Sequence, residues 1–532
     1  MTDNQTPQAL FKRFEKAKAK RNQNWWSHMS ECYDYAAPQR ETFNHYGAGA
    51  KKNVDNADST AVVALETFAS RLQSYMVPPW QKWALISLGA SVPDEVGEQQ
   101  VQFEGKEMTV NEALEVTTDI VFEYIHRSNF DTKVFEALLD LGVSTGNMTL
   151  EYDAAADELV FNTLPLSQMF LEPGPRGDID NHWREWDIEL GHVERMWPQA
   201  KFSDELKKVI AEKPEKKQTF IEGCIYAGKD NYRYVVMHKS KKDLIVDEEM
   251  DSTPFISFRS SVVPGETYGR GRVMLVLPAI KTLNMVVEFE LKAGAMASSG
   301  CWTGVSDGFF NPYNIEVAPG VIIPVQSNDP RNPSLAQLPM DFNFNFTQLK
   351  KEELQGEINR ALFANPIGSM EDPTKTATEI TIRKQMDLQE SGGFFSRLFT
   401  EFVNKVVSRS VYLLSKEGLI PQIKIDGKDY TIKHTSPLAM AMDLEDVDVV
   451  DQVVQRLMGY DPTGALMAAG LKLEDVPAYI SSKLGLDPVL VRTEAEREEK
   501  VTAAKEQMNE QQQIQGGAGP TAQPISMATQ GQ

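Results

Sequence analysis

Residues 265–300 read GETYGRGRVMLVLPAIKTLNMVVEFELKAGAMASSG, and this stretch decides the fold. Pro278 suits the first turn of a helix, because the N–H that proline lacks would have no partner there in any case. Beyond Pro278, apolar residues recur three or four positions apart and predict a helix with one apolar face. They are Ile280, Leu283, Val287 and Leu291. About 22 residues at 1.5 Å each make a rod of roughly 33 Å.

A second helix is predicted to return beside the first. Residues 301–341 are rich in Gly, Pro and Asn and indicate a small module between the two rods; FNFNF at 342–346 is expected to be extended. The second rod, about 348–363, has an apolar stripe of Leu354, Ile358 and Leu362. These stripes are too sparse for the rods to bury each other within one small body. We therefore expect neighbouring copies to cover them, in side-by-side contacts that close into a ring or grow into a filament.

The residues before the first rod predict helices followed by strands. Helical spacing of apolar residues indicates helices over about 8–36, 59–77 and 109–141. The last of these is a pair of helices, and Gly142 is expected to terminate its second member. Residues 147–262 alternate apolar and polar positions, which predicts a β-rich module with a helical insert near 194–210. The predicted fold class is therefore α+β.

The residues after the second rod begin with the loop NPIGSMEDPTK and a capping box formed by Thr376 and Glu379. A long helical region should start there, bend at Gly392 and Gly393, and end at Gly418. Its second half should bury Phe395, Leu398, Phe399, Phe402 and Val406. IKIDGKDYTIK then predicts a hairpin, and short helices and a charged helix follow. The last roughly 20 residues should be disordered.

The composition limits the classes of function. The 532 residues carry a formal net charge of −22. A chain this acidic should not coat nucleic acid through its general field, so any DNA contact must be local. The basic run in the first helix is expected to form a solvated face; it consists of Lys12, Arg13, Lys16, Lys18, Lys20 and Arg21. We expect neither a signal peptide nor a membrane span.

The three cysteines, Cys32, Cys224 and Cys301, form no CxxC pair and fit a reducing compartment better than a disulfide framework or a zinc site. Gly265, Gly269 and Gly271 lack the Gly-Lys-Ser/Thr ending of a phosphate-binding loop and are expected to turn the chain tightly into the helix.

One stretch has residues that could hold a metal: Asp178, Asp180, His182, Asp187 and His192. Their spacing is neither that of H-E-x-x-H nor that of a facial triad, and they lie in a predicted β-rich surface. No nucleophile lies in a Gly-x-Ser-x-Gly or similar setting. We therefore predict no enzyme, no cofactor and no metal.

Three stretches together resemble the portal, or head-to-tail connector, proteins of short-tailed (podovirus) bacteriophages. They are GETYGRGRVMLVLPAIKTLN, ALFANPIGSMEDPTKTATEITIRKQ and, near the N-terminus, STAVVALETFASRLQSYMVPPWQKWALI. Each is weak alone, but their order and spacing are more specific, and the resemblance extends from about residue 8 to about residue 500.

The resemblance implies a portal fold that assembles as a ring of twelve subunits at one capsid vertex. The division that it implies is a wing (1–262), a passage into and through the first stem helix (263–300), a clip (301–341), a second stem helix (342–364), a tunnel loop (365–376), a long bent wing helix with a hairpin (377–442), a crown (443–510) and a disordered tail (511–532). It also implies a virion location, after assembly in the host cytoplasm.

The resemblance further implies a channel through which double-stranded DNA passes without sequence-specific contacts. Its partners would be the terminase large subunit, a tail adaptor protein, and the major capsid and scaffolding proteins. Candidate DNA-facing residues are Lys350, Lys351 and Lys375. The tunnel loop would include Asn365, Pro366, Gly368, Pro373 and Thr376. For Lys350 and Lys351 the alternative is that they are solvated stem charges paired with Glu352 and Glu353.

Two other classes of protein stay open. One is a different virion component, such as a tail adaptor or an internal core protein, which the position in the particle would distinguish from a portal. The other is an acidic cytosolic metal-dependent hydrolase, which only the Asp/His stretch at 178–192 favours. Activity that a chelator abolishes would support the hydrolase.

Overall fold

The structure is a computed structural model, and its contacts divide the chain into two units, residues 1–434 and 435–532. The residues that it describes are 6–44, 49–50, 52, 56–89, 97, 99–103, 105–228, 231–299, 302–304, 331, 335–337, 344–364, 392–421, 430–436, 447, 449–457, 476 and 479–480. In the second unit the described part includes a helical stretch at 449–457.

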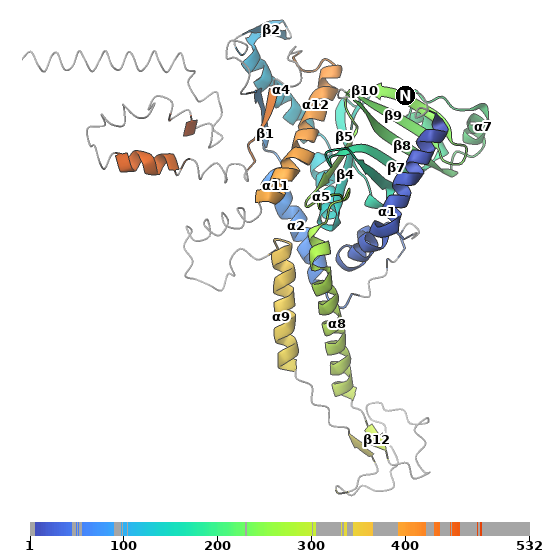
Figure 1. Ribbon diagram of the computed structural model, residues 1–532, viewed down its shortest axis with the longest axis vertical. Coiled ribbons are helices and arrows are strands. Elements are labelled where there is room, and N and C mark those ends of the chain that lie inside the picture. The colour runs from blue at the N-terminus through green and yellow to red at the C-terminus, as the bar shows by residue number, and fades with distance from the viewer. Residues whose placement is uncertain are drawn as a thin grey trace, which may run out of the picture. The chain divides into compact units, whose positions relative to one another are not determined.

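The first unit contains helices and antiparallel sheets, which confirms the α+β class (Figure 1). The larger sheet has the order β10-β9-β8-β7-β6. Its strands are β6 (Met169–Pro173), β7 (Ile179–Glu189), β8 (Lys217–Gly228), β9 (Asn231–His238) and β10 (Asp243–Met250). The second sheet has the order β11-β4-β5, from β4 (Thr145–Asp153), β5 (Glu158–Thr163) and β11 (Phe255–Arg259). The expected insert is two helices, α6 (Leu190–Met196) and α7 (Asp204–Glu212).

Helix α1 (Pro7–Ala36) packs its apolar face on the larger sheet. Leu10, Phe14 and Ala17 contact a buried cluster that includes Phe170 and Trp183. The interplanar angle of 88° between Phe14 and Phe170 is the edge-to-face geometry that aromatic rings favour. The apolar residues whose spacing predicted this helix are thus the ones that pack it against one face of the larger sheet.

The sequence predicted that the basic run of α1 forms one solvated face. In the structure it does not, because one of its residues is buried. Arg21 is buried and donates through Nη1 to the carbonyl oxygens of Leu166, Ser167 and Met169, at 2.6–3.1 Å. Its guanidinium lies 4.0 Å from the centroid of the Phe170 ring. Because these carbonyls belong to the turn η3 (Leu166–Gln168) and the start of β6, Arg21 fastens α1 to the edge of the sheet.

Two helices pack on the smaller sheet, α4 (Val110–Arg127) and α5 (Phe130–Val143). A third helix, α2 (Thr60–Met76), packs on α5. Gly142 does not terminate α5, since the helix continues to Val143 and Gly142 is buried in its last turn. A Cβ at Gly142 would lie 2.3 Å from Leu65 Cδ1, so the glycine allows α2 to approach α5 closely.

The predicted strand near residue 430 exists as β14 (Tyr430–His434). Its described partner is β1 (Ala84–Leu88), 346 residues away in the central pair Ile86 and Ile432. The turn of the predicted hairpin, at Asp426 and Gly427, lies outside the described residues. A further small sheet pairs β2 (Gln100–Phe103) with β3 (Lys106–Thr109).

Helix α8 spans Arg272–Ser299 and therefore begins six residues earlier than the sequence predicted. Pro278 lies inside the helix, on an exposed face. Proline in a helix interior costs about 3 kcal/mol. Burial of Val276 and Leu277 in the same turns contributes about 1.5–3 kcal/mol each, which offsets that cost.

The glycines before α8 make the tight approach that the sequence predicted. A Cβ at Gly271 would lie 2.2 Å from the carbonyl oxygen of Val143 and 2.3 Å from that of Gly142. At Gly269 it would lie 2.7 Å from the carbonyl oxygen of Ser144. The chain can enter α8 only because these two side chains are absent.

Helix α9 spans Phe344–Ala361. Residues 344–346, expected to be extended, are helical. The alternation FNF is too short to separate a strand from a helix end.

The last helical region of the first unit begins with α11 (Gly392–Leu398) and ends with α12 (Asn404–Lys416). A π-helical segment, η5 (Phe399–Val403), lies between the two, and we call it the wide turn. Gly418, with φ of 75°, ends the helical region as predicted. Phe395, Leu398, Phe402 and Val406 are buried as expected, and Phe399 is half-buried. The part of the prediction that concerns residues 365–391 lies outside the described residues, and the wide turn was not predicted.

Candidate functional site, the helices α8 and α9

Helices α8 and α9 run side by side and antiparallel (Figure 1). Glu290 of α8 lies 3.6 Å from Lys351 of α9, from carboxylate oxygen to ammonium nitrogen. Past the helix ends, β12 (Trp302–Gly304) pairs with β13 (Leu335–Gln337). Helices α8 and α9 therefore correspond to the two rods that the sequence predicted.

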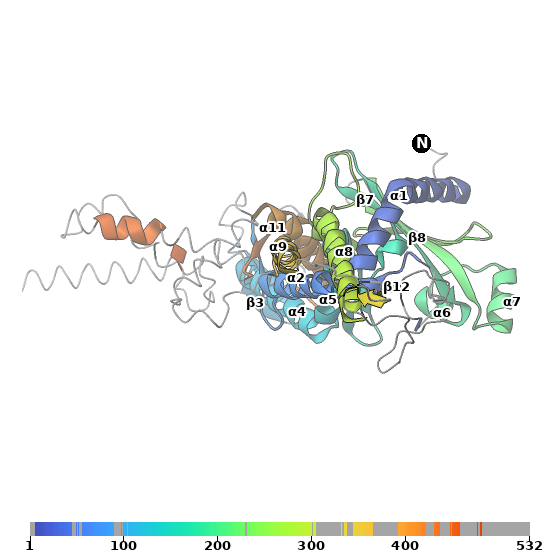
Figure 2. The same ribbon diagram turned by 90° about the horizontal axis from the view of Figure 1, so that it is seen from below.

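The buried faces of the two helices hold them to each other and to the rest of the first unit. They consist of Val273, Met274, Val276, Leu277, Ile280, Leu283 and Val287 on α8, and of Leu354, Ile358 and Leu362 on α9. Figure 2 looks along α9 and shows α8 and α2 beside it. Because α2 contacts both helices, the apolar stripes read from the sequence are partly covered within one chain.

Polar contacts fix the height of one helix against the other. The backbone N–H of Asp58 donates to Asn284 Oδ1 of α8 at 3.1 Å. The amide of Gln355 on α9 donates to Asp58 Oδ2 at 3.2 Å and to Thr60 Oγ1 at 3.3 Å. Asp58 thus connects α8, α9 and the start of α2.

A second apolar face of α8 is exposed, and the sequence analysis missed it. We call this face the outer stripe; its residues are Leu275, Pro278, Thr282, Met285 and Phe289. The side chains of Met285 and Phe289 are 55% and 59% exposed. The spacings alternate between three and four, which is the pattern of a helix that packs against another helix. That alternation is visible in the sequence and could have identified the stripe.

The opposite helix exposes a different kind of surface. We call one exposed face of α9 its outward face; its residues are Leu349, Glu352, Glu353, Gly356 and Arg360. Gln348, Lys350 and Glu357 are also exposed, to either side of this face. Leu349 is 67% exposed. Among the described residues, and apart from the backbone of α9 itself, no atom lies within 4 Å of the position that a Cβ on Gly356 would take. The two outward faces of the helix pair are therefore chemically unlike each other.

The two candidate DNA-facing lysines of α9 each have a carboxylate partner. Lys350 Nζ lies 2.7 Å from Glu353 Oε2 on the same helix. Lys351 pairs with Glu290 of α8 rather than with Glu352. The third candidate, Lys375, lies outside the described residues, as do Asn365, Pro366, Gly368, Pro373 and Thr376. That Lys350 and Lys351 face DNA stays a prediction.

The Asp/His stretch does not converge on one point. His182 is buried in β7, where its ring stacks on Phe255 and neither ring nitrogen has a partner in the first unit as described. His192 is 71% exposed on α6, and Asp187 accepts a hydrogen bond from Thr219. Over the described ranges, no three His, Cys, Asp or Glu side chains are grouped so that they could hold a metal ion.

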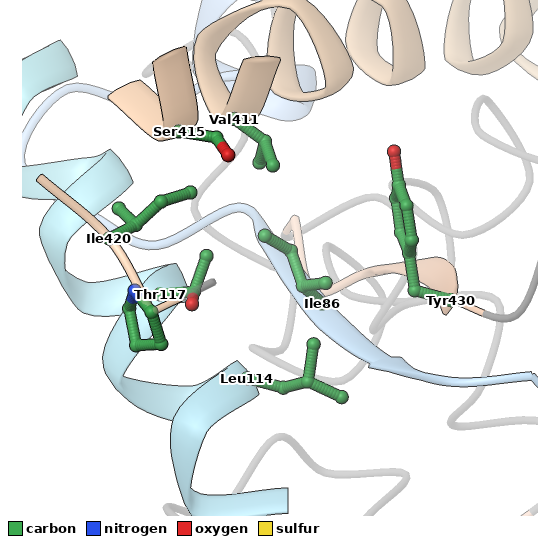
Figure 3. A pocket seen from close by; sticks show the side chains of 8 residues that line it. Ile86, Leu114, Thr117, Val411, Ser415, Ile420 and Tyr430 are labelled. Carbon is green, nitrogen blue, oxygen red and sulfur yellow. The ribbon is translucent and has the colours of Figure 1, made fainter. Parts of the chain in front are cut away.

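One pocket of about 90 Å³ lies between β1, α4, α12 and β14 (Figure 3). Apolar side chains dominate its lining, among them Ile86, Leu114, Val411 and Ile420. Small-molecule sites usually enclose about 300–1,000 Å³. This pocket is too small for a typical substrate or cofactor.

Comparison with known proteins places these features in a family. Residues 7–490 match the family described as bacteriophage head to tail connecting protein. The chain belongs to this family. The resemblance read from the sequence is thus confirmed, and the connector has a structural role between the head and the tail of a phage particle.

Other comparisons add less. No curated protein matches the connector. A solved structure described as "Neck of empty GTA particle computed with C6 symmetry" is similar at 14% sequence identity, over 81% of this chain and 90% of that chain, with a TM-score of 0.32. No helix in the described ranges is both long and apolar enough to span a membrane.

Proposed function

We propose that the connector is a phage portal, a ring of twelve subunits at one capsid vertex. The ring forms the channel through which a terminase motor packages DNA, which retains the DNA and later releases it, and to which the tail attaches. In this proposal α8 and α9 form the stem. Residues 301–341 form the clip that meets the motor and then a tail adaptor, residues 365–376 line the tunnel, and residues 443–510 form the crown.

One observation supports the ring most strongly, the exposure of Met285 and Phe289 on α8. Burying a large apolar side chain contributes about 1.5–3 kcal/mol. Exposed apolar side chains at helix-packing spacing are therefore typical of a surface that another chain covers. Two unlike faces on opposite sides of the pair suit a head-to-tail interface, which closes into a ring when the rotation allows it.

The net charge supports a conduit for DNA. Twelve copies at −22 each carry −264. A wall of net negative charge repels phosphates, and at a Debye length of about 8 Å it does so only for DNA close to the wall. A channel of this kind does not hold its cargo tightly.

The experiment that tests the proposal measures the mass of the purified full-length protein by light scattering, together with negative-stain imaging. We expect rings with a central hole and the mass of twelve chains. A protein that stays monomeric at every concentration and salt concentration contradicts the proposal.

Lys375 provides a test of the tunnel. We propose that its ammonium group reaches the phosphates of the passing duplex, so that Lys375→Glu leaves ring assembly intact and alters packaging or DNA retention. The measurement is phage yield and packaged genome length with the variant supplied in place of the natural protein. Unchanged yield and length remove Lys375 from the DNA-facing residues.

A further inference from the structure

The two outward faces of the α8–α9 pair match each other in height. Because the helices are antiparallel, moving along the pair in one direction lowers the residue number on α8 and raises it on α9. Glu290 is level with Lys351, and Asn284 is level with Gln355 through Asp58. Met285 therefore lies at the height of Gly356, within one or two residues at about 1.5 Å each.

The two faces also match in shape. Met285 projects from α8 and is 55% exposed. Gly356 leaves an open position on α9, where no other described part of the chain comes within 4 Å of a Cβ. Phe289, one turn further from the rest of the first unit, is level with residues 350–352, and Leu349 lies one to three residues beyond that height, at about 1.5 Å each. Leu349 there is another exposed apolar side chain, so an apolar residue on one face meets an open or apolar position on the other.

Within the part of the chain that the structure describes, no contact requires a glycine at position 356. An exposed glycine in a helix interior is less stable than alanine by about 1 kcal/mol, and here alanine would meet no steric obstacle. A glycine at such a position lets a neighbouring side chain approach the helix backbone closely. This second observation indicates a partner on the outward face of α9.

We propose that the outer stripe of one subunit packs against α9 of the next copy of the same chain, with Met285 inserted at Gly356 and Phe289 on Leu349. This inference rests on the proposed ring and assigns its contact. We take the ring axis to run along the two helices. Rotation about such an axis keeps every residue at its height, so the match within one subunit becomes a match between subunits. Because the two faces lie on opposite sides of the helix pair, the contact is head-to-tail and cannot form a symmetric dimer.

Disulfide formation tests the register directly. The double variant Met285→Cys with Gly356→Cys brings two thiols together across the contact, where Cα atoms about 4.4–6.8 Å apart allow a bond. Mild oxidation of assembled rings should give a ladder of covalent oligomers on a non-reducing gel. All variants carry Cys301→Ser, because the third natural cysteine lies outside the described residues. In that background either single variant should give none, since the remaining natural thiols, Cys32 and Cys224, are buried.

A matched control uses the same outward face of α9. Arg360 is exposed one turn from Gly356, about 6 Å along the helix. Met285→Cys with Arg360→Cys should cross-link at least about tenfold more slowly, because its thiols lie outside the range that a disulfide spans. If the Met285/Gly356 pair assembles into rings of normal mass but yields only monomer bands, the inference is wrong and the ring stands. If no ring forms from the natural protein, the proposed function itself fails.

A second variant pair tests the contact without cross-linking. Gly356→Leu fills the open position and should lower the fraction of protein in rings at least about tenfold, while the monomer stays folded by circular dichroism. Glu357→Leu adds the same side chain to an exposed position about 100° further round the helix and should assemble normally. Adding Met285→Ala to Gly356→Leu should restore assembly in part. Normal assembly of Gly356→Leu alone would overturn the inference.

Discussion

Arg259 and Glu401 form a buried ion pair that joins the β11 strand to the wide turn in the last helical region. The Arg259 side chain is 1% exposed, and its Nη2 lies 2.7 Å from Glu401 Oε1. The same arginine donates to the carbonyl oxygens of Thr267 and Gly177, at 3.0 and 3.2 Å. Glu401 lies in η5, so the irregular helix and the ion pair coincide.

Removing the carboxylate should destabilise the fold strongly. Glu401→Ala leaves the Arg259 charge buried without its counter-ion, and breaking a buried pair in this way costs about 3–5 kcal/mol. Glu136→Ala is a control, since it removes a partly exposed pair with Lys133, and pairs near the surface contribute about 0–1 kcal/mol. The measurement is the midpoint of thermal or urea unfolding. Equal shifts of the midpoint in the two variants would show that the buried pair contributes no more to the free energy of unfolding than the Lys133–Glu136 pair does.

His182 should make the fold sensitive to acid. Burial, with a smaller contribution from the charge of Lys405, lowers the pKa of His182 from 6.5 to about 3. Above pH 6.5 the ring is neutral in both the folded and the unfolded chain. Below that pH the unfolded chain takes up a proton that the folded chain excludes, so stability falls as the pH drops from 6.5 toward 3.

We therefore expect His182→Leu to lose less stability on acidification than the natural protein. The difference should reach about 2 kcal/mol at pH 5, since each pH unit below 6.5 corresponds to about 1.4 kcal/mol. Urea unfolding at pH 7 and pH 5 measures it. His192→Leu, at an exposed position on α6, should behave as the natural protein does. A His182→Leu variant with the full acid dependence contradicts the assignment.

Single residues were predicted well where burial by a nearby stripe decided them, as for Phe402 and Val406. Arg21 was misassigned because a basic residue within a basic run resembles its exposed neighbours. What buries it is a set of three carbonyl oxygens about 145 residues away. Such a partner cannot be inferred from local spacing.

At the scale of elements, the start of α8 depends on backbone contact rather than on side chains. Gly271→Ala should prevent the close packing of this start on α5, because its Cβ would overlap two carbonyl oxygens that cannot move independently. We expect a loss of more than about 3 kcal/mol or failure to fold, at the upper end of single-substitution effects.

Soluble yield and unfolding midpoint measure the effect of Gly271→Ala. Gly294→Ala is the matched control: Gly294 lies in the same helix, and no other described part of the chain comes within 4 Å of its Cβ position, so the variant should gain up to about 1 kcal/mol. A Gly271→Ala variant as stable as the Gly294→Ala variant would falsify the packing argument.

Elements were predicted where one face is apolar and the ends have clear signals. Helix α2, which begins beside Ser59, is an example. The start of α8 was misplaced because an internal proline resembles an N-terminal one when the burial of Val276 and Leu277 is not known. The wide turn at 399–403 was missed because the contact of Glu401 with Arg259 spans 142 residues. Neither feature has a local signature.

At the scale of the whole molecule, net charge governs the response to DNA. Assembled protein at about 0.15 M salt should bind a short duplex more weakly than about 10⁻⁴–10⁻⁶ M, the range of non-specific DNA binding. Fluorescence anisotropy of a labelled duplex provides the measurement. A micromolar dissociation constant at this salt concentration would show that positive side chains dominate the accessible surface.

The family could be recognised from the order of three weak motifs, whereas the surface that we propose for assembly could not. Periodicity identifies apolar residues but does not say which of two stripes the chain itself covers. On α8 the predicted stripe is mostly buried, and the second one, with Met285 and Phe289, is exposed. Only the packing of α2 and α9 distinguishes them.

Asp58 has a mechanical consequence. It is held to Asn284 and accepts from Gln355, and its Oδ1 accepts the N–H of Thr60 at the start of α2. Arg71 of α2 also donates to the carbonyl oxygen of Phe363, at the end of α9. A force applied at the far end of α8 or α9 is therefore shared by both helices and transmitted to α2. The two helices should bend together, as one mechanical unit.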